Sequence, residues 1–404
     1  MEATNFLLSL DSKIIKYGLE RTIQLLNVCG NPHLSLKSIQ IIGTNGKGSM
    51  ASMLSNVLIQ NNYKVGLYTS PHLVSINERI RVNHKKISNR FMNNFIKKHK
   101  KDLLIIEPSF FEIMTVMALC YFVKHQIDFA ILETGLGGRL DSVTAALADT
   151  LIYTPIAIDH IAFLGDSLSS IAQEKSGAIS KNCSFIFSVI QRQAVQKILN
   201  SQAKKYNKSI FYNNKKILPY DLTGEHQIKN ANFARFVLEK LITQYKLKLL
   251  HINKHLSKTF WPGRIQFIQK SPDVVFDVAH NDHSLRAFID YFSTIADNYK
   301  HRYLVVGFEK GKQVDKSMKK LYKLFTHTII TETKIRHSME ASYIAALHKK
   351  EYKSCIFIEL NPTKAITDSM NKMNKQDITV IIGSHYFGPY IFKLFKNSFD
   401  FQTK

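Results

Sequence analysis

A glycine-rich segment at residues 43–49, with the sequence G-T-N-G-K-G-S, most constrains how this chain folds. It follows a β-branched run that contains Ile39, Ile41 and Ile42, and it opens a helix-compatible stretch at 49–60. A strand, a glycine-rich turn and a helix N-terminus form the context in which backbone N–H groups surround a phosphate. The segment therefore predicts an α/β fold with a mononucleotide-binding loop.

Two side chains give this loop its expected chemistry. Lys47 supplies a cation for the terminal phosphates, and Ser49 supplies a hydroxyl for Mg²⁺. The spacing departs from G-x-x-x-x-G-K-[ST], because Gly43 lies only three residues before Gly46 and Gly48 separates the lysine from the hydroxyl. Kinases, ATPases and ligases all use phosphate loops, so the loop alone leaves the reaction open.

Short apolar runs alternate with amphipathic stretches along most of the chain, which is typical of a parallel sheet covered by helices. The first series of expected strands lies at 38–43, 65–69, 128–133, 150–155 and 184–189. The expected helices in this part lie at 49–60, 110–123, 168–176 and 226–245. A second series of strands is expected at 273–278, 303–307, 328–331, 354–358 and 378–383.

The stretch 257–263 lies between the two series, and its Trp-Pro-Gly sequence suits a linker. We therefore expect an α/β protein with two domains. Residues 1–262 are predicted to form an N-terminal P-loop ATPase domain with a mostly parallel sheet. Residues 263–404 are predicted to form a smaller, Rossmann-like α/β domain of ordinary size.

The composition favours a cytoplasmic protein. Hydrophobic residues make up 45% of the 404 residues and charged residues 21%, as in ordinary soluble proteins. We expect no membrane span and no secretion signal, because no apolar run is long enough and the first ten residues lack a basic stretch before an apolar core. The four cysteines form no C-x-x-C pair, which indicates reduced thiols. They are Cys29, Cys120, Cys183 and Cys355.

The formal net charge of +24 raises the alternative of a nucleotide-dependent nucleic-acid-binding protein. The lysines are spread along the whole chain, however, and no basic helix or aromatic-basic platform stands out. Solvated lysines explain this charge, and a positive field attracts anionic ligands such as ATP. We therefore expect no nucleic-acid partner.

The loop and a series of later motifs resemble the folylpolyglutamate synthase and dihydrofolate synthase family, which belongs to the Mur ligase superfamily. The motifs follow one another in the family's order along nearly the whole chain. They are G-T-N-G-K-G-S at 43–49, T-S-P-H-L at 69–73, N-E-R-I-R at 77–81, E-T-G-L-G-G-R-L-D at 133–141, D-H at 159–160, E-K-S-G at 174–177, G-E-H-Q-I-K-N-A at 224–231, W-P-G-R-I-Q at 261–266 and D-V-A-H-N at 277–281.

The resemblance implies a Mur-ligase-type ATP-binding domain at 1–262 and a glutamate-ligase domain at 263–404. It implies an ATP-dependent ligase that joins L-glutamate to dihydropteroate, to the glutamate tail of a reduced folate such as tetrahydrofolate, or to both. The bacterial bifunctional type, acting as a monomer, is our expectation. Transfer of the γ-phosphoryl group to the acceptor carboxylate gives an acyl phosphate that the amine attacks, with Mg²⁺ balancing the developing charge.

The resemblance also implies a set of ligands for two Mg²⁺ ions. From its position alone, Glu133 is equally well a solvated strand end, and His160 is a structural histidine. The matching lysine of the superfamily is carbamylated, which makes carbamylation of Lys175 a hypothesis here. The implied metal ligands are Ser49, Ser70, Glu133, His160 and Lys175.

Other roles follow from the same resemblance. Asn230, near His226 and Gln227, is expected to face the adenine or the phosphates, Arg264 the terminal phosphates, and Asp277 the ribose. The complete implied nucleotide-binding set is Gly43, Thr44, Asn45, Gly46, Lys47, Gly48, Ser49, Asn230, Arg264 and Asp277. The implied catalytic residues are Lys47, Lys175 and His280, and the implied substrate-binding residues are Arg79 and Asp141.

The chain departs from the family's usual pattern in several places, including two that bear on the acceptor. Ser-Val-Thr at 142–144 replaces Ala-Thr-Asn, and the stretch 308–314 replaces a usual M-x-x-D-K-type segment. These departures leave the acceptor and the length of any polyglutamate open. A Mur ligase acting on a peptidoglycan precursor is the alternative within the class, and the segments at 70–73 and 77–79 argue against it.

Overall fold

The computed structural model describes residues 3–11, 18–335, 337–349, 352 and 354–400. The chain forms two compact units. Unit 1 contains Met1–Asp221 and Ile228–Thr259, and unit 2 contains Leu222–Gln227 and Phe260–Lys404. The functional boundary predicted between residues 262 and 263 stays a prediction.

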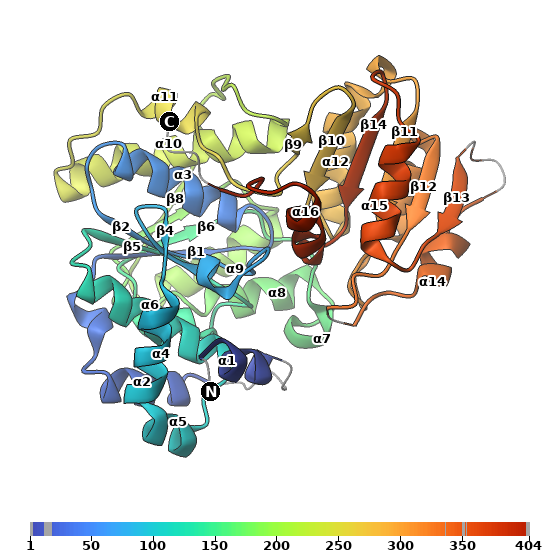
Figure 1. The fold of residues 1–404 in the computed structure, drawn as a ribbon. Helices are drawn as coiled ribbons and strands as arrows, with labels where there is room; N and C mark the ends of the chain where they lie inside the picture. The colour runs from blue at the N-terminus through green and yellow to red at the C-terminus, as the bar shows by residue number, and fades with distance from the viewer. Residues whose placement is uncertain (1–2, 12–17, 336, 350–351, 353, 401–404) are drawn as a thin grey trace. The chain divides into compact units, whose positions relative to one another are not determined.

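Unit 1 is built on a sheet with the strand order β4-β3-β2-β5-β1-β6-β7-β8 (Figure 1). The six neighbouring strands β2, β5, β1, β6, β7 and β8 pair in parallel. Strands β3 and β4 add an antiparallel edge beside β2. The strands are β1 (Ser38–Ile42), β2 (Val65–Tyr68), β3 (Ile80–Val82), β4 (Lys85–Lys86), β5 (Phe129–Glu133), β6 (Thr150–Tyr153), β7 (Phe185–Ser188) and β8 (Ile210–Tyr212). The central strands β1, β2, β5 and β6 are buried along their whole length, as helices covering both faces require.

Helices cover this sheet. The α-helices of this part of the chain are α1 (Ala3–Asp11), α2 (Glu20–Val28), α3 (Lys47–Ile59), α4 (Asn89–Lys98), α5 (Lys100–Ile106), α6 (Phe110–Lys124), α7 (Ile161–Leu164), α8 (Leu168–Ser176), α9 (Gln193–Lys204), α10 (Glu225–Tyr245) and α11 (Ile252–Ser257). Short 3₁₀ helices are η1 (Pro32–Ser35), η2 (Ile76–Arg79) and η3 (Ser142–Ala146). The predicted apolar helix at 110–123 is α6, which is buried on nearly all sides between the sheet and α2.

Unit 2 has a sheet with the order β13-β12-β11-β14-β10-β9, in which only β9 runs antiparallel (Figure 1). Its strands are β9 (Gln266–Gln269), β10 (Asp273–Asp277), β11 (Arg302–Val306), β12 (His327–Ile330), β13 (Cys355–Ile358) and β14 (Ile378–Ile382). Its helices are α12 (Asp282–Ser293), η4 (Ala296–Asn298), α13 (Asp315–Leu324), α14 (Ala341–Ala346), α15 (Pro362–Asn371), η5 (His385–Phe387) and α16 (Gly388–Leu394). The expected fold class, two α/β domains with mostly parallel sheets, is confirmed.

The predicted strands all exist, but four short ones were not predicted. Strands β3, β4, β8 and β9 are two to four residues long, and β4, β8 and β9 are only partly buried or exposed. Such strands lack the apolar run or the alternation that makes a strand visible in a sequence. In the described part of the chain, no helix has both the length and the apolar character needed to cross a bilayer.

Glu112, in the first turn of α6, holds this helix against α2. Its carboxylate accepts the backbone N–H of Ser109 at 2.6 Å and lies 3.3 Å from Nε of Arg21. The hydroxyl of Thr22 is 3.5 Å from the second carboxylate oxygen. Glu112 is 4% exposed, so its charge is satisfied by these partners rather than by water.

We therefore predict that Glu112→Ala lowers the free energy of unfolding by about 2–4 kcal/mol, because Arg21 and the start of α6 lose their buried partner. Glu112→Gln keeps an acceptor for Ser109 and is expected to lose less. Urea denaturation followed by circular dichroism measures both. Equal stability of Glu112→Ala and the wild type would show that apolar contacts alone hold α6 against α2.

Candidate active site

Four loops of unit 1 leave the carboxyl ends of neighbouring parallel strands. They follow β1, β2, β5 and β6, which lie side by side in the order β2-β5-β1-β6. Parallel pairing puts all four strand ends at one edge of the sheet, where α/β proteins bind their ligands. Most of the predicted site residues lie on these loops.

The loop at 43–46 has the backbone conformation of a phosphate-binding turn. Gly46 has φ +84°, a left-handed conformation that glycine adopts without strain, and it begins α3 as its N-cap. Gly43 passes so close to β6 that a Cβ atom there would lie 2.0 Å from Oγ1 of Thr154. The N–H of Thr44 donates to the carbonyl of Pro155 at 2.9 Å, which fixes the loop to the segment after β6. The N-terminus of α3 therefore stands at a rigid turn, with Ser49 buried in its first turn.

Two lysine amines lie on this loop. Nζ of Lys47 donates to the carbonyl of Thr44 at 3.2 Å, and Nζ of Lys175, from α8, donates to the carbonyl of Gly43 at 2.9 Å. Lys175 is only 5% exposed. Burial and the nearby charge of Lys47 lower the pKa of Lys175 to about 7, against the opposing attraction of Asp159 and Asp141. Two cationic groups around a glycine turn form a site for anions.

Asn230 lies on the other side of the same turn. It comes from α10, and a Cβ atom at Gly46 would lie 3.1 Å from its Oδ1. The structure thus brings Asn230 to the loop from a segment far along the chain.

Glu133 ends β5 beside this loop, since it pairs in register with Ile41 of β1. Its carboxylate is 5% exposed, and one oxygen accepts the backbone N–H of Ser70 at 3.1 Å. Ser70 and Glu133 therefore lie together at the strand ends. Among the described residues, no three His, Cys, Asp or Glu side chains gather to hold a metal ion.

The chemistry of the predicted ligands shows whether Mg²⁺ suits this site. The predicted ligands are two serine hydroxyls, one carboxylate, one imidazole and the carbamate of a modified Lys175. Mg²⁺ prefers oxygen ligands, is held by few protein ligands and keeps several waters. The buried carboxylate of Glu133, which accepts the backbone N–H of Ser70, suits a hard cation of this kind. The residues present fit the ion.

The segment after β6 carries Asp159 and His160. His160 has φ +53° and begins α7, and its side chain is 43% exposed. The side chain of Asp159 is 8% exposed, and its Oδ1 accepts the N–H of His160 at 2.8 Å. Asp159 also attracts the amine of Lys175. The sequence analysis assigned a role to His160 but none to Asp159. The position of Asp159 in the D-H motif at 159–160 could have indicated that it belongs to the site.

Arg79 and Asp141 lie near the fully buried phenol of Tyr68. Both of them, together with Glu133, act on the pKa of Tyr68, which burial raises far above its ordinary value. The guanidinium of Arg79 stands 5.0 Å from the ring centre of Phe110 and donates to Nδ1 of His72 at 2.9 Å. The two predicted substrate residues are thus brought into one neighbourhood.

Asp141 has a clear structural task in this neighbourhood. Its oxygens accept the N–H groups of Leu136 and Val143 at 2.8 and 2.9 Å. Burial raises its pKa to about 6, although these N–H groups oppose the shift. Thr144, in the segment that departs from the family's pattern, donates to the carbonyl of Gly138 at 2.7 Å. Thr144 therefore ties the segment 142–144 to Gly138.

Unit 2 contains the other three predicted residues. The carboxylate of Asp277, at the end of β10, accepts the N–H groups of Ile265 and Ala279, each at 2.7 Å. Burial raises its pKa, and the charge of Arg264 opposes this shift. Nδ1 of His280 is 2.8 Å from the carbonyl of Val278. The structure thus groups Arg264, Asp277 and His280 at the carboxyl end of one strand.

Comparisons with known proteins give the site its context. Residues 263–385 match the family model of the Mur ligase glutamate ligase domain. The chain is 30% identical over 417 residues to the dihydrofolate synthase/folylpolyglutamate synthase of Bacillus subtilis, covering 92% of this chain and 94% of that protein.

Two solved structures of similar fold carry ligands. Escherichia coli FolC in complex with DHPP and ADP has a TM-score of 0.83 and 25% identity, covering 97% of this chain and 96% of that chain. The bifunctional folylpolyglutamate synthase/dihydrofolate synthase of Yersinia pestis, complexed with AMPPNP and Mn ion, has a TM-score of 0.82 and 25% identity, covering 96% of each chain. The identity to the Bacillus subtilis protein extends over nearly the whole of both chains, and the chain therefore belongs to the dihydrofolate synthase/folylpolyglutamate synthase family of ATP-dependent amide-bond-forming ligases.

Proposed function

We propose that this protein joins L-glutamate to dihydropteroate, to the glutamate tail of tetrahydrofolate, or to both, while ATP is converted to ADP and phosphate. One observation carries the proposal within this family: two lysine amines donate to the phosphate-binding turn of unit 1, and the buried carboxylate of Glu133 ends the neighbouring strand. The relatives crystallised with ADP and DHPP, and with AMPPNP and Mn ion, support the same ligand classes here.

The reaction activates a carboxylate and then lets an amine attack it. The acceptor carboxylate takes the γ-phosphoryl group of ATP, and the resulting acyl phosphate loses phosphate when glutamate attacks. Charge accumulates on the phosphoryl oxygens in the first step, so fixed cations and N–H groups at 43–49 lower its barrier. We assign the phosphate contacts to this loop, with Lys47 at the terminal phosphates and Asn230 at the adenine or phosphate side.

We assign the divalent metal ligands to Ser49, Ser70, Glu133 and His160. Bound Mg²⁺ would polarise the phosphoryl oxygens and neutralise their charge. Glu133 is held by the N–H of Ser70, which orients its carboxylate before any ion arrives. Carbamylation would turn Lys175 from a cation into an anionic oxygen ligand for a second ion.

We assign the later part of the chain, 263–404, to glutamate transfer. Arg264 would meet the terminal phosphates, Asp277 the ribose, and His280 the acyl phosphate and the incoming glutamate. Hydrogen bonds of Asp277 support this proposal. Its carboxylate accepts the N–H groups of Ile265 and Ala279 and so fixes the segments next to Arg264 and His280. Arg79 and Asp141 are proposed to contact the acceptor. A cytoplasmic location and a monomeric state stay predictions.

The central test is ADP release by the purified protein with ATP, Mg²⁺ and L-glutamate. We expect release with dihydropteroate or tetrahydrofolate and none with a UDP-muramoyl peptide, which represents the alternative Mur ligase reaction. Release with the muramoyl peptide alone would contradict the proposed acceptor. If none of these acceptors supports ADP release, the proposed function is contradicted.

Variants separate the roles at the site. Lys47→Ala is expected to lower kcat by about 100-fold or more, because the terminal phosphates lose a fixed cation. Glu133→Gln keeps the acceptor for the N–H of Ser70 but removes the charge, and a similar loss is expected with an unchanged melting temperature. Near-normal turnover of Glu133→Gln over a range of Mg²⁺ concentrations would exclude a metal-binding role for this carboxylate.

Carbamylation of Lys175 has its own test. Only the unprotonated amine reacts with carbon dioxide, and the folded protein lowers the pKa of Lys175 from 10.5 to about 7. The reactive fraction therefore rises as the pH passes upward through about 7, well below the range of surface lysines. In ¹³C-bicarbonate, we expect a carbamate carbon resonance that grows between about pH 6 and 8 and is missing in Lys175→Arg. Its absence from the wild type across this range would exclude the modification.

A further inference from the structure

The outer sides of α2 and α5 carry exposed apolar side chains, outside the loops of the proposed active site. On α5, Leu104 is 64% exposed and Ile105 is 81% exposed, whereas Leu103 is buried. On α2, Ile23 is 46% exposed and Val28 is 43% exposed. The two helices pack against each other, and Figure 1 shows them at the edge of unit 1. Single exposed apolar residues are ordinary, but several on two neighbouring helices form a patch that is typical of an interaction site.

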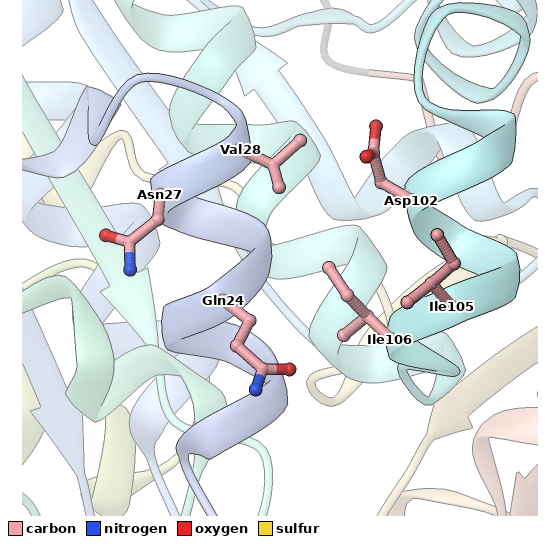
Figure 2. A pocket seen from close by; sticks show the side chains of 6 residues that line it. All are labelled: Gln24, Asn27, Val28, Asp102, Ile105 and Ile106. Atoms are coloured by element: carbon pink, nitrogen blue, oxygen red, sulfur yellow. The ribbon is translucent and has the colours of Figure 1, made fainter.

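A hollow between the two helices belongs to the same surface. Figure 2 shows Gln24, Asn27 and Val28 of α2 facing Asp102, Ile105 and Ile106 of α5 across it. Asp102 is the one charged side chain among these six, and its Oδ2 lies 3.8 Å from Nδ1 of His99. We define the α2–α5 face as Ile23, Gln24, Asn27, Val28, Leu104, Ile105 and Ile106. It therefore consists of aliphatic and uncharged polar side chains.

Lysines lie beside the apolar end of this face. Two lysines end α4 and two more begin α5, and all four are exposed. Because residues four apart lie on one side of a helix, Lys100 lies one turn before Leu104, and Lys101 lies one turn before Ile105. The helix pair 89–106 as a whole contains five basic residues and one acidic residue. The outer side of α5 is therefore basic at its start and apolar at its end.

This combination of charge and apolar surface suits an anionic lipid bilayer. Aliphatic side chains enter the boundary between headgroups and acyl chains, while lysines keep their ammonium groups at the anionic headgroups. Single-stranded nucleic acid needs aromatic side chains for its bases, and the α2–α5 face contains none. A second copy of this chain would bring two like-charged surfaces together, since each chain has a formal net charge of +24. Charge complementarity therefore favours the lipid surface.

We propose that unit 1 binds reversibly to an anionic lipid surface through the α2–α5 face and the four lysines at 97–101. Leu104 and Ile105 enter the headgroup boundary, and the lysines before them meet the lipid charges. All of these residues belong to unit 1. The binding does not depend on the proposed ligase reaction, because none of these side chains belongs to the proposed active site.

The test is sedimentation of the full-length protein with lipid vesicles. One set of vesicles contains phosphatidylcholine with about one-third phosphatidylserine, and the other contains phosphatidylcholine alone. We expect sedimentation with the anionic vesicles at about 0.1 M salt and release at about 0.5 M, because salt screens the lysines. Binding to phosphatidylcholine alone should be at least about tenfold weaker. No sedimentation with the anionic vesicles, or equal sedimentation with both sets, would overturn the proposal.

The apolar contribution is tested with the double variant Leu104→Gln/Ile105→Gln. Glutamine favours the helix, and both positions are exposed, so the fold should be kept. We expect about tenfold weaker binding to the anionic vesicles, because the inserted side chains are lost. Leu250→Gln removes another apolar side chain of unit 1, one that is 67% exposed, and should bind like the wild type. Equal binding of the double variant and the wild type would exclude the α2–α5 face.

The lysines are tested with Lys100→Gln/Lys101→Gln. Each lysine close to an anionic surface strengthens binding by about fivefold, so a loss of about tenfold or more is expected. Lys204→Gln/Lys205→Gln removes the same charge at the end of α9 and should have a much smaller effect. Equal losses in the two double variants would show that only the overall charge of the chain attracts the vesicles, which would overturn the proposed surface.

Two measurements without lipid complete the test. ADP release in solution should be unchanged in all of these variants, so failure of vesicle binding and failure of the proposed function are distinguishable. Sedimentation velocity should show no dimer that depends on Leu104 and Ile105. A dimer that Leu104→Gln/Ile105→Gln abolishes would assign the α2–α5 face to a second copy of the chain and overturn the proposal.

Discussion

The parallel pairing of β1 with β5 on one side and β6 on the other is the constraint on which the site depends. Ile41 pairs with both Glu133 and Ile152, so the three strands end at nearly the same level. The ladders continue past the strand ends, where Thr134 donates to the carbonyl of Ile41 and Thr154 to that of Ile42. The glycine turn, the carboxylate of Glu133 and the segment after β6 are therefore held side by side by backbone hydrogen bonds.

This backbone frame allows an unusual concentration of positive charge. The amines of Lys47 and Lys175 both donate to carbonyls of the same turn, and little solvent reaches Lys175. A buried cation beside a second cation is costly unless a negative group joins them. Asp159 and Asp141 offset part of this cost, and a phosphate or a carbamate would offset the remainder. The same shortage of negative charge gives the loop its affinity for anions.

Much of the fold and of the nucleotide loop was predictable, because both rest on local patterns. The glycines at 43–48 directly indicate the backbone conformation of the loop, and the buried strands appear as apolar runs. The burial of Lys175 was not predictable in the same way, since its helix has no marked apolar face and its partner, the carbonyl of Gly43, is a backbone atom far away in the sequence. The family resemblance supplied roles for Glu133, His160 and Lys175 that single positions left open.

Strands β2 and β5 are neighbours, so the chain between them leaves the sheet and returns to it at adjacent places. Its middle part, which contains β3, β4, α4 and α5, can lengthen or shorten without altering the pairing of β1 with β5 and β6. In evolutionary terms, insertions there would reshape the surroundings of Arg79 while the nucleotide loop is inherited unchanged. One ATP-driven chemistry can in this way be passed on to descendants that accept different carboxylates.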